Sequence, residues 1–187
     1  MKDIALNQIT VPRRRLSTGA IALALVGTLM SPFLAAQPAL SQNASLTPLV
    51  KASSWLNGTP SQASLRGKVV LVDVFTFACV NCMNITPNLR SLERAKASDG
   101  LTIVGIHSPE TAYEHDHSAV VTNLKTLGIT CPVAIDNDFA LWNAYHIAFW
   151  PTQLIFDRRG ILRKTVIGDS QDALVNQTIE TLLKERA

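Results

Sequence analysis

The sequence has few cysteines: three among 187 residues, Cys79, Cys82 and Cys131. A small secreted domain held together by disulfides usually contains more of them, in even number. Only two residues separate Cys79 from Cys82, so a bond between them would remove little entropy from the unfolded chain. The chain is also long enough to bury an ordinary apolar core. The close pair is therefore not predicted to serve stability.

The sequence also lacks a second pair of cysteines or histidines at the short spacing that zinc sites use. His115 and His117 are two residues apart, and side chains at that spacing on a helix point to different sides. We interpret both as solvent-exposed, and we predict neither a metal site nor a cofactor. The other candidate ligands stand alone in the sequence: His107, Cys131 and His146.

An excess of charge of one sign is missing from most of the chain. There are 17 basic and 14 acidic residues, and the positive excess falls within residues 1–41, which include Arg13, Arg14 and Arg15. The rest of the chain has no basic stripe with interleaved aromatic residues, the pattern that would indicate nucleic-acid binding. We therefore expect no nucleic-acid partner.

The long hydrophobic segment lies near the N-terminus. The three arginines precede the run GAIALALVGTLM, and small residues follow it, which is typical of an export signal. Residues 16–36 are also long enough to form a membrane anchor. We predict a signal peptide or N-terminal membrane anchor over residues 1–41, a linker and lead-in over 42–64, and one domain over 65–187. The predicted location is periplasmic or extracytoplasmic, with the protein either soluble or anchored.

Strand and helix patterns alternate through the domain. The β-branched run KVVLVDVFTF predicts a buried strand, and the cysteine pair then opens a helix that ends at Asp99-Gly100. Further elements are predicted in LTIVGIH (strand), 109–127 (helix), CPVAID (strand), NDFALWNAYH (short helix), TQLIFDRRGILRKTVIG (hairpin) and DSQDALVNQTIETLLKER (amphipathic helix). This order indicates an α/β fold with helices on both faces of a sheet.

Because neither a stabilising disulfide nor a metal site is predicted, redox chemistry is the best interpretation of the Cys-x-x-Cys pair. A cysteine at a helix start lies near unpaired backbone N–H groups and the positive end of the helix dipole, and both favour a thiolate. Cys79 is therefore predicted to be the attacking nucleophile. Cys82, one turn further in and less exposed, is predicted to resolve the mixed disulfide.

The stretch LRGKVVLVDVFTFACVNC resembles the thioredoxin superfamily, in particular its exported TlpA/ResA-like, redoxin-type branch. That family has an acidic residue six positions before the first cysteine and a proline eight after it, and Asp73 and Pro87 stand there. WPTQLIF matches the family's cis-proline segment, which makes Pro151 the candidate. The resemblance implies a thioredoxin-like fold, a central mixed sheet with helices on both faces and an insertion between the first βαβ unit and the cis-Pro hairpin.

The resemblance also implies roles for the matched residues. Asp73, in an apolar strand, would have a raised pKa and take the proton from Cys82. A cis Pro151 would leave the backbone of Trp150 free to pair with a substrate chain, with Trp150 at the rim. The two residues between the cysteines would contact the substrate and tune the reduction potential; they are Val80 and Asn81.

The implied activity is reduction of disulfides in client proteins through a redox-active Cys79–Cys82 disulfide. Cytochrome c precursors are one family-typical client. The middle of the domain looks like the subgroup associated with DsbD/CcdA-type membrane electron carriers, so a separate membrane protein would supply electrons. Cys131 matches no family position, and we interpret it as a small buried apolar residue.

Two alternatives share this fold. Thr76, three residues before Cys79, fits the Thr-x-x-Cys of a redoxin-type thiol peroxidase. A Sco-like copper chaperone uses two cysteines and a distant histidine, but it spaces its cysteines by three residues rather than two.

Overall fold

The structure is a computed structural model that describes residues 44–186. The signal peptide or anchor predicted over residues 1–41 lies outside the described residues. Within the described range, no helix combines the length and the apolar character needed to cross a bilayer.

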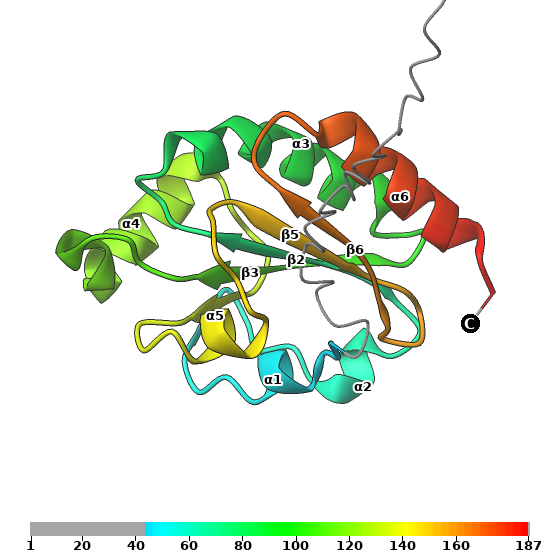
Figure 1. The fold of residues 1–187 in the computed structure, drawn as a ribbon, viewed down its shortest axis with the longest axis horizontal. Coiled ribbons are helices and arrows are strands. Elements are labelled where there is room, and N and C mark those ends of the chain that lie inside the picture. The colour runs from blue at the N-terminus through cyan, green and yellow to red at the C-terminus, as the bar shows by residue number, and fades with distance from the viewer. Residues whose placement is uncertain (1–43, 187) are drawn as a thin grey trace, which may run out of the picture. The chain divides into compact units, whose positions relative to one another are not determined.

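A six-stranded mixed sheet forms the centre of the domain (Figure 1). The strands lie in the order β1-β4-β3-β2-β5-β6; β2, β3 and β4 are parallel, and β1, β5 and β6 are antiparallel to their neighbours. Every residue of the central strand β2 is buried, as its unbroken apolar, β-branched run predicts. The strands are β1 (Trp55–Leu56), β2 (Val69–Phe75), β3 (Leu101–His107), β4 (Val133–Ile135), β5 (Thr152–Phe156) and β6 (Leu162–Ile167).

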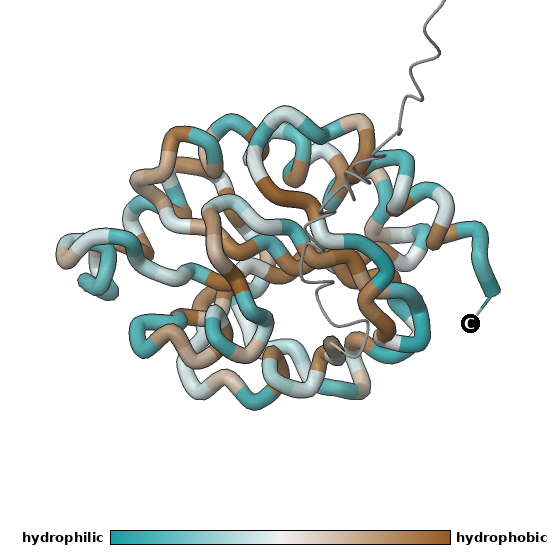
Figure 2. The backbone as a smooth tube through the Cα atoms, in the orientation of Figure 1, coloured by the Kyte–Doolittle hydropathy of each residue, from teal (hydrophilic) through white to brown (hydrophobic). Residues whose placement is uncertain are grey.

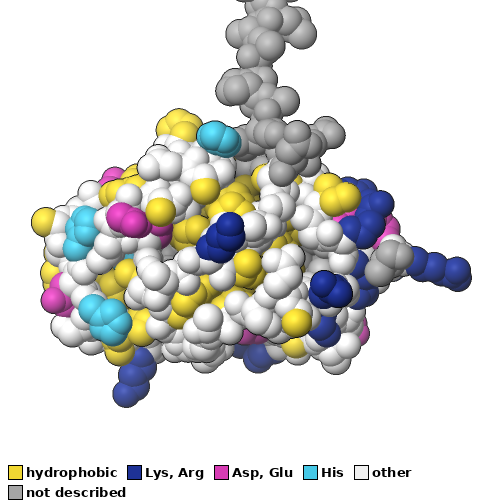
Figure 3. All heavy atoms as spheres, turned by 90° about the horizontal axis from the view of Figure 1, so that it is seen from below, with side chains coloured by type: hydrophobic (Ala, Val, Ile, Leu, Met, Phe, Trp, Pro, Cys, Tyr) yellow, Lys and Arg dark blue, Asp and Glu magenta, His cyan; other side chains and the backbone are white. Residues whose placement is uncertain are grey.

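Helices cover both faces of the sheet, which confirms the predicted fold class. The longer ones lie on one face: α3 (Val80–Lys96), α4 (His117–Leu127) and α6 (Asp172–Lys184) (Figure 1). The other face carries α1 (Thr47–Val50), α2 (Gln62–Leu65) and α5 (Ala140–Ala144). Figure 2 shows the hydrophobic residues concentrated in the strands between these two layers. Because α1, α2 and α5 are only four or five residues long, apolar side chains remain visible in the middle of their face (Figure 3).

The lead-in predicted over residues 42–64 contains more structure than its composition indicates. From residue 44 on it forms α1, β1 and the start of α2, and β1 pairs with β4 at the edge of the sheet. Leu46 and Leu49 are buried in the core beneath the sheet. The Tyr145 hydroxyl accepts a hydrogen bond from the amide of Leu49 and donates one to the carbonyl of Ser45. This part of the chain is therefore packed against the domain.

The predicted helix over 109–127 begins too early. Residues 112–115 form a 3₁₀ helix, and α4 begins at His117 with Asp116 as its N-cap. The Asp116 carboxylate accepts the amide of Ala119 at 2.7 Å, which is the contact that starts an α-helix. The first turn is different because the side chain of Glu114 points into the protein, where it is fully buried.

The register of the sheet brings three loops to one end of the domain. Phe75, the last residue of β2, pairs with His107 at the end of β3, and Val74 pairs with Thr152 at the start of β5. The cysteine loop after β2, the segment after β3 and the loop that contains Trp150 and Pro151 therefore meet at the same edge.

Candidate active site

Cys79 occupies the N-cap position of α3. Three residues in a turn follow β2, and the helix then begins with no side-chain cap and no acidic residue in its first turn. The unpaired N–H groups of the first turn of α3 and the positive end of the helix dipole are therefore directed toward Cys79. Cys79 is partly exposed, and the thiols of all three cysteines are free.

Cys82 lies one turn further into α3 and is buried, with 4% of its surface exposed. Burial raises the pKa of its thiol far above the usual range. A hydrogen bond with Cys79 and the negative charge of Asp73 raise this pKa further, and a hydrogen bond with the backbone of Thr76 opposes them only in part. Cys82 is therefore a thiol at neutral pH and needs a base before it can act as a nucleophile.

Asp73 lies beneath the cysteine pair, in the middle of β2. It is buried, and its Oδ1 has no hydrogen-bond partner among the described residues. Burial raises its pKa to about 7. A carboxylate with that pKa can accept a proton from a neighbouring thiol and release it again near neutral pH.

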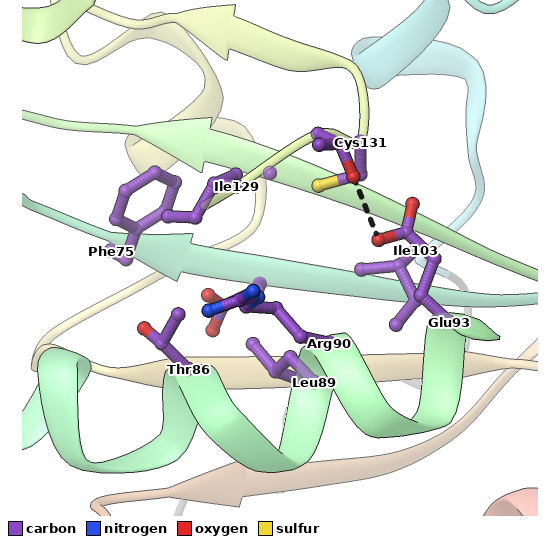
Figure 4. A pocket seen from close by; sticks show the side chains of 11 residues that line it. Phe75, Thr86, Leu89, Arg90, Glu93, Ile103, Ile129 and Cys131 are labelled. Atoms are coloured by element: carbon purple, nitrogen blue, oxygen red, sulfur yellow. Dashed lines mark hydrogen bonds between the residues drawn. The ribbon is translucent and has the colours of Figure 1, made fainter. Parts of the chain in front are cut away.

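A cavity of about 20 Å³ lies between α3 and the sheet, with Asp73 in its wall; that is room for about one water molecule. Figure 4 shows Thr86 and Arg90 pointing into it from α3, with Cys131 opposite. Burial, followed by the charges of Glu93 and Asp73, raises the pKa of Cys131 to about 12. As the sequence predicts, Cys131 is a small buried residue.

The Trp150–Pro151 peptide bond is cis. Trp150 is half-buried; its indole N–H donates to the carbonyl of Ser108 at 2.9 Å, and its ring lies 4.2 Å from that of Trp142. These contacts fix the loop beside the cysteines. The residues between the cysteines, Val80 and Asn81, are exposed.

Exposed apolar side chains lie on the loops that meet at the cysteine end of the sheet. Val80 is 64% exposed and Phe149, next to Trp150, is 61% exposed. Tyr113 of the 3₁₀ helix is also exposed, and its ring packs edge-on against Phe77, which immediately follows Thr76.

Two buried polar residues near the cysteine loop, Glu114 and His107, are not indicated as site residues by the sequence. The Glu114 carboxylate accepts hydrogen bonds from the Thr76 hydroxyl and from the amide of Ala78, one residue before Cys79. The four residues TAYE, Thr111 to Glu114, have the pattern of a capping box, and the structure contains that box. The pattern could have indicated a helix start there, but not the contact with the cysteine loop.

The predicted exposure of the other histidines agrees with the structure. His115 ends the 3₁₀ helix, His117 begins α4, and both side chains are exposed. Within residues 44–186, no three His, Cys, Asp or Glu side chains lie close enough together to hold a metal ion.

The chain is similar to thioredoxin-like proteins and to proteins named for thiol–disulfide exchange. A family model described as thioredoxin-like matches residues 67–162, just over half of the chain. Protein DipZ of Mycobacterium tuberculosis is 33% identical over 138 residues, 71% of this chain but 20% of DipZ. The thiol-disulfide oxidoreductase YkuV of Bacillus subtilis is 28% identical over 71% of this chain and 89% of YkuV. A thiol-disulfide isomerase from Corynebacterium glutamicum matches 72% of this chain and 93% of that structure, with a TM-score of 0.65 and 26% identity. The chain therefore spans about a fifth of DipZ and most of YkuV.

Proposed function

The chain belongs to the thioredoxin-like family, and we propose that it is an exported thiol–disulfide oxidoreductase that reduces disulfide bonds in client proteins. The observation that carries this proposal is the arrangement of three groups. A partly exposed Cys79 begins α3, a buried Cys82 lies one turn below it, and Asp73 lies next to Cys82 with its pKa raised to about 7.

In the first step, the thiolate of Cys79 attacks one sulfur of the client disulfide. The client S–S bond breaks, a mixed disulfide forms on Cys79, and the other client sulfur leaves as a thiolate that takes up a proton. The position of Cys79 at the start of α3 supports this role, because the amides of the first turn favour negative charge on its sulfur.

In the second step, Cys82 gives its proton to Asp73 and its sulfur attacks the sulfur of Cys79. The mixed disulfide breaks, the second client sulfur leaves as a thiolate and is protonated, and a Cys79–Cys82 disulfide remains. Two electrons have then passed from the cysteine pair to the client. The raised pKa of Cys82 makes a base necessary, and Asp73 is the carboxyl group whose charge acts on this thiol.

The surface around the pair supports a protein client. Exposed Val80 and Phe149 offer apolar contacts, and an extended client segment would pair with the backbone of Trp150 beside the cis Pro151. Val80 and Asn81 separate the two cysteines in the sequence, and they would also influence the reduction potential.

The oxidised pair needs a source of electrons for the next cycle. We assign this role to a separate membrane protein of the DsbD/CcdA type, and we assign the site of action to the periplasm or another extracytoplasmic space. The export pattern in residues 1–41 supports this location. Determining the N-terminal residue of the protein recovered from its native host tests whether that segment is removed.

The position of Thr76 argues against the thiol peroxidase alternative. Its side chain is fully buried, and its hydroxyl donates to the carboxylate of Glu114 rather than facing a substrate beside Cys79. His107 is likewise buried, with its ring stacked on that of Phe77, which argues against its use as a distant copper ligand.

A direct comparison of two substrates tests the proposed activity. With a small dithiol as electron source, the protein should reduce insulin disulfides much faster than it consumes hydrogen peroxide. Cys79→Ser should lose the insulin activity. Faster turnover of peroxide, or full insulin activity in Cys79→Ser, would contradict the proposal.

A further inference from the structure

Glu114 lies directly behind the turn that leads into Cys79. Its side chain is fully buried, and each of its two oxygens has partners. Oε1 accepts from the Thr76 hydroxyl and from the Ala78 amide at 3.1 Å. Oε2 accepts from the amides of Glu110 and Thr111 at 2.9 and 2.7 Å. One carboxylate thus joins the turn before Cys79 to the segment that follows β3.

These four contacts account for the charge on a buried group. Burial acts to raise the pKa of Glu114, but the hydrogen bonds from Thr76, Thr111, Ala78 and Glu110 outweigh it and hold the pKa below its usual range. The carboxylate is therefore ionised at neutral pH. Hydrogen bonds to a charged acceptor are shorter and stronger than those between neutral groups.

His107 extends the arrangement by one more group. Its Nε2 lies 3.4 Å from the Thr76 hydroxyl oxygen. Because that hydroxyl uses its proton for Glu114, we assign the ring proton to Nε2, which then donates to Thr76. Burial lowers the pKa of His107 to about 4, so the ring is neutral. The hydrogen bonds therefore run from the His107 ring to the Thr76 hydroxyl and from that hydroxyl to the Glu114 carboxylate.

The Glu114 carboxylate also lies next to an exposed aromatic residue. Tyr113, adjacent to Glu114, is 64% exposed and packs edge-on against Phe77, with 5.5 Å between ring centres. Phe77 in turn stacks on His107, at 5.4 Å. The nucleophile turn and the exposed aromatic residue next to it are therefore fixed to each other through one buried group.

We propose that Glu114 is a positioning residue for disulfide exchange: it fixes the turn of residues 76–78, and through it Cys79, against the segment that carries Tyr113. This inference rests on the proposed function. The geometry gives a reason for a charged side chain in the interior. One carboxylate oxygen accepts hydrogen bonds from the turn before Cys79, and the other accepts them from the segment that follows β3. Small displacements of a nucleophile can lower a rate by as much as about 100-fold.

Glu114→Gln is the central variant because glutamine keeps the shape but has only one acceptor oxygen. The single oxygen of glutamine can accept hydrogen bonds either from Thr76 and Ala78 or from the amides of Glu110 and Thr111. Its NH₂ group then faces the other two donors, to which it cannot bond. Glu110→Gln is the matched control: it removes the same charge four residues away, from an exposed side chain whose backbone contact to Glu114 remains.

The readout is the rate constant of mixed-disulfide formation on Cys79, measured in a Cys82→Ser background at saturating client concentration. We expect Glu114→Gln to lower it by about tenfold or more, and Glu110→Gln to leave it unchanged. The folded fraction is determined separately by circular dichroism. A folded Glu114→Gln variant that reacts within about twofold of its parent would overturn the proposal.

Thr76 provides a second test that does not depend on Glu114→Gln folding. Thr76→Val removes only the hydroxyl from the arrangement and should slow the same step, and Thr76→Ser should restore it. If Thr76 has a purely structural role, Thr76→Val should lower the stability but leave the rate constant of mixed-disulfide formation in the folded protein unchanged. That result would contradict the proposal. If the parent protein itself forms no mixed disulfide, the proposed function fails instead, so the two failures are distinct.

Discussion

The buried environment of Asp73 changes the chemistry of its carboxyl group. Its carboxyl group is buried in the central strand, with Oδ1 unpartnered within the described residues, and burial raises its pKa to about 7. The folded state therefore holds the Asp73 proton between about pH 4 and pH 7, whereas the unfolded chain has released it. In the proposed exchange reaction this raised pKa suits Asp73 to act as a base, but it reduces stability at neutral pH and above.

The first prediction concerns stability. As pH rises from about 4 to 7, the wild-type protein should lose about 1.4 kcal/mol per pH unit relative to Asp73→Asn, roughly 4 kcal/mol in total. The sign follows because the native state binds more protons than the unfolded state in this interval. Urea denaturation of both proteins at pH 4, 5.5 and 8 measures the difference. A difference in unfolding free energy that does not vary with pH would contradict the assigned pKa.

The second prediction concerns the resolving step. Asp73→Asn should slow the attack of Cys82 on the mixed disulfide by about 100-fold, since general bases typically contribute 10²–10⁴. The adduct on Cys79 should then accumulate during turnover, as non-reducing gel electrophoresis can detect. Glu93→Gln is the control, because Glu93 lines the same cavity between α3 and the sheet as Asp73 does, at a position away from Cys82. Equal accumulation in both variants would indicate that Asp73 is not the base.

At the scale of elements, the sequence pattern predicted the central strands and α3 well and the short segments poorly. The run ending in Phe75 is apolar throughout, so its identity as a buried strand does not depend on other parts of the chain. The start of α4 does depend on them: Glu114 points inward because its partners include Thr76 and Ala78, more than 30 residues earlier. Local periodicity carries no information about such a contact.

The lead-in gives the third prediction. Leu49 of α1 is fully buried beneath the sheet, so Leu49→Ala should lower the free energy of unfolding by about 2–4 kcal/mol. Thr47→Ala, on the exposed side of the same helix, should change it by less than about 0.5 kcal/mol. Chemical denaturation of the two variants gives both values. Equal, small effects would indicate that residues before β1 behave as a linker in solution.

At the scale of the whole molecule, the candidate site is assembled by the sheet. The parallel pairing of β2 with β3 and the antiparallel pairing of β2 with β5 bring Cys79, Glu114 and Trp150 to one edge. The spacing of the cysteines predicted a redox pair from the residues alone. The nearness of Pro151 followed only from the family resemblance, because strand order is a property of the complete fold.

The central claim is that Cys79 attacks and Cys82 resolves. The measurement that tests it most directly is the trapping of clients in an extracytoplasmic extract by variants in which one cysteine of the pair is replaced, followed by non-reducing electrophoresis and mass spectrometry. The account predicts stable client adducts on Cys79 in the Cys82→Ser variant and none in Cys79→Ser. Adducts on Cys82 in the Cys79→Ser variant, with none in Cys82→Ser, would contradict it.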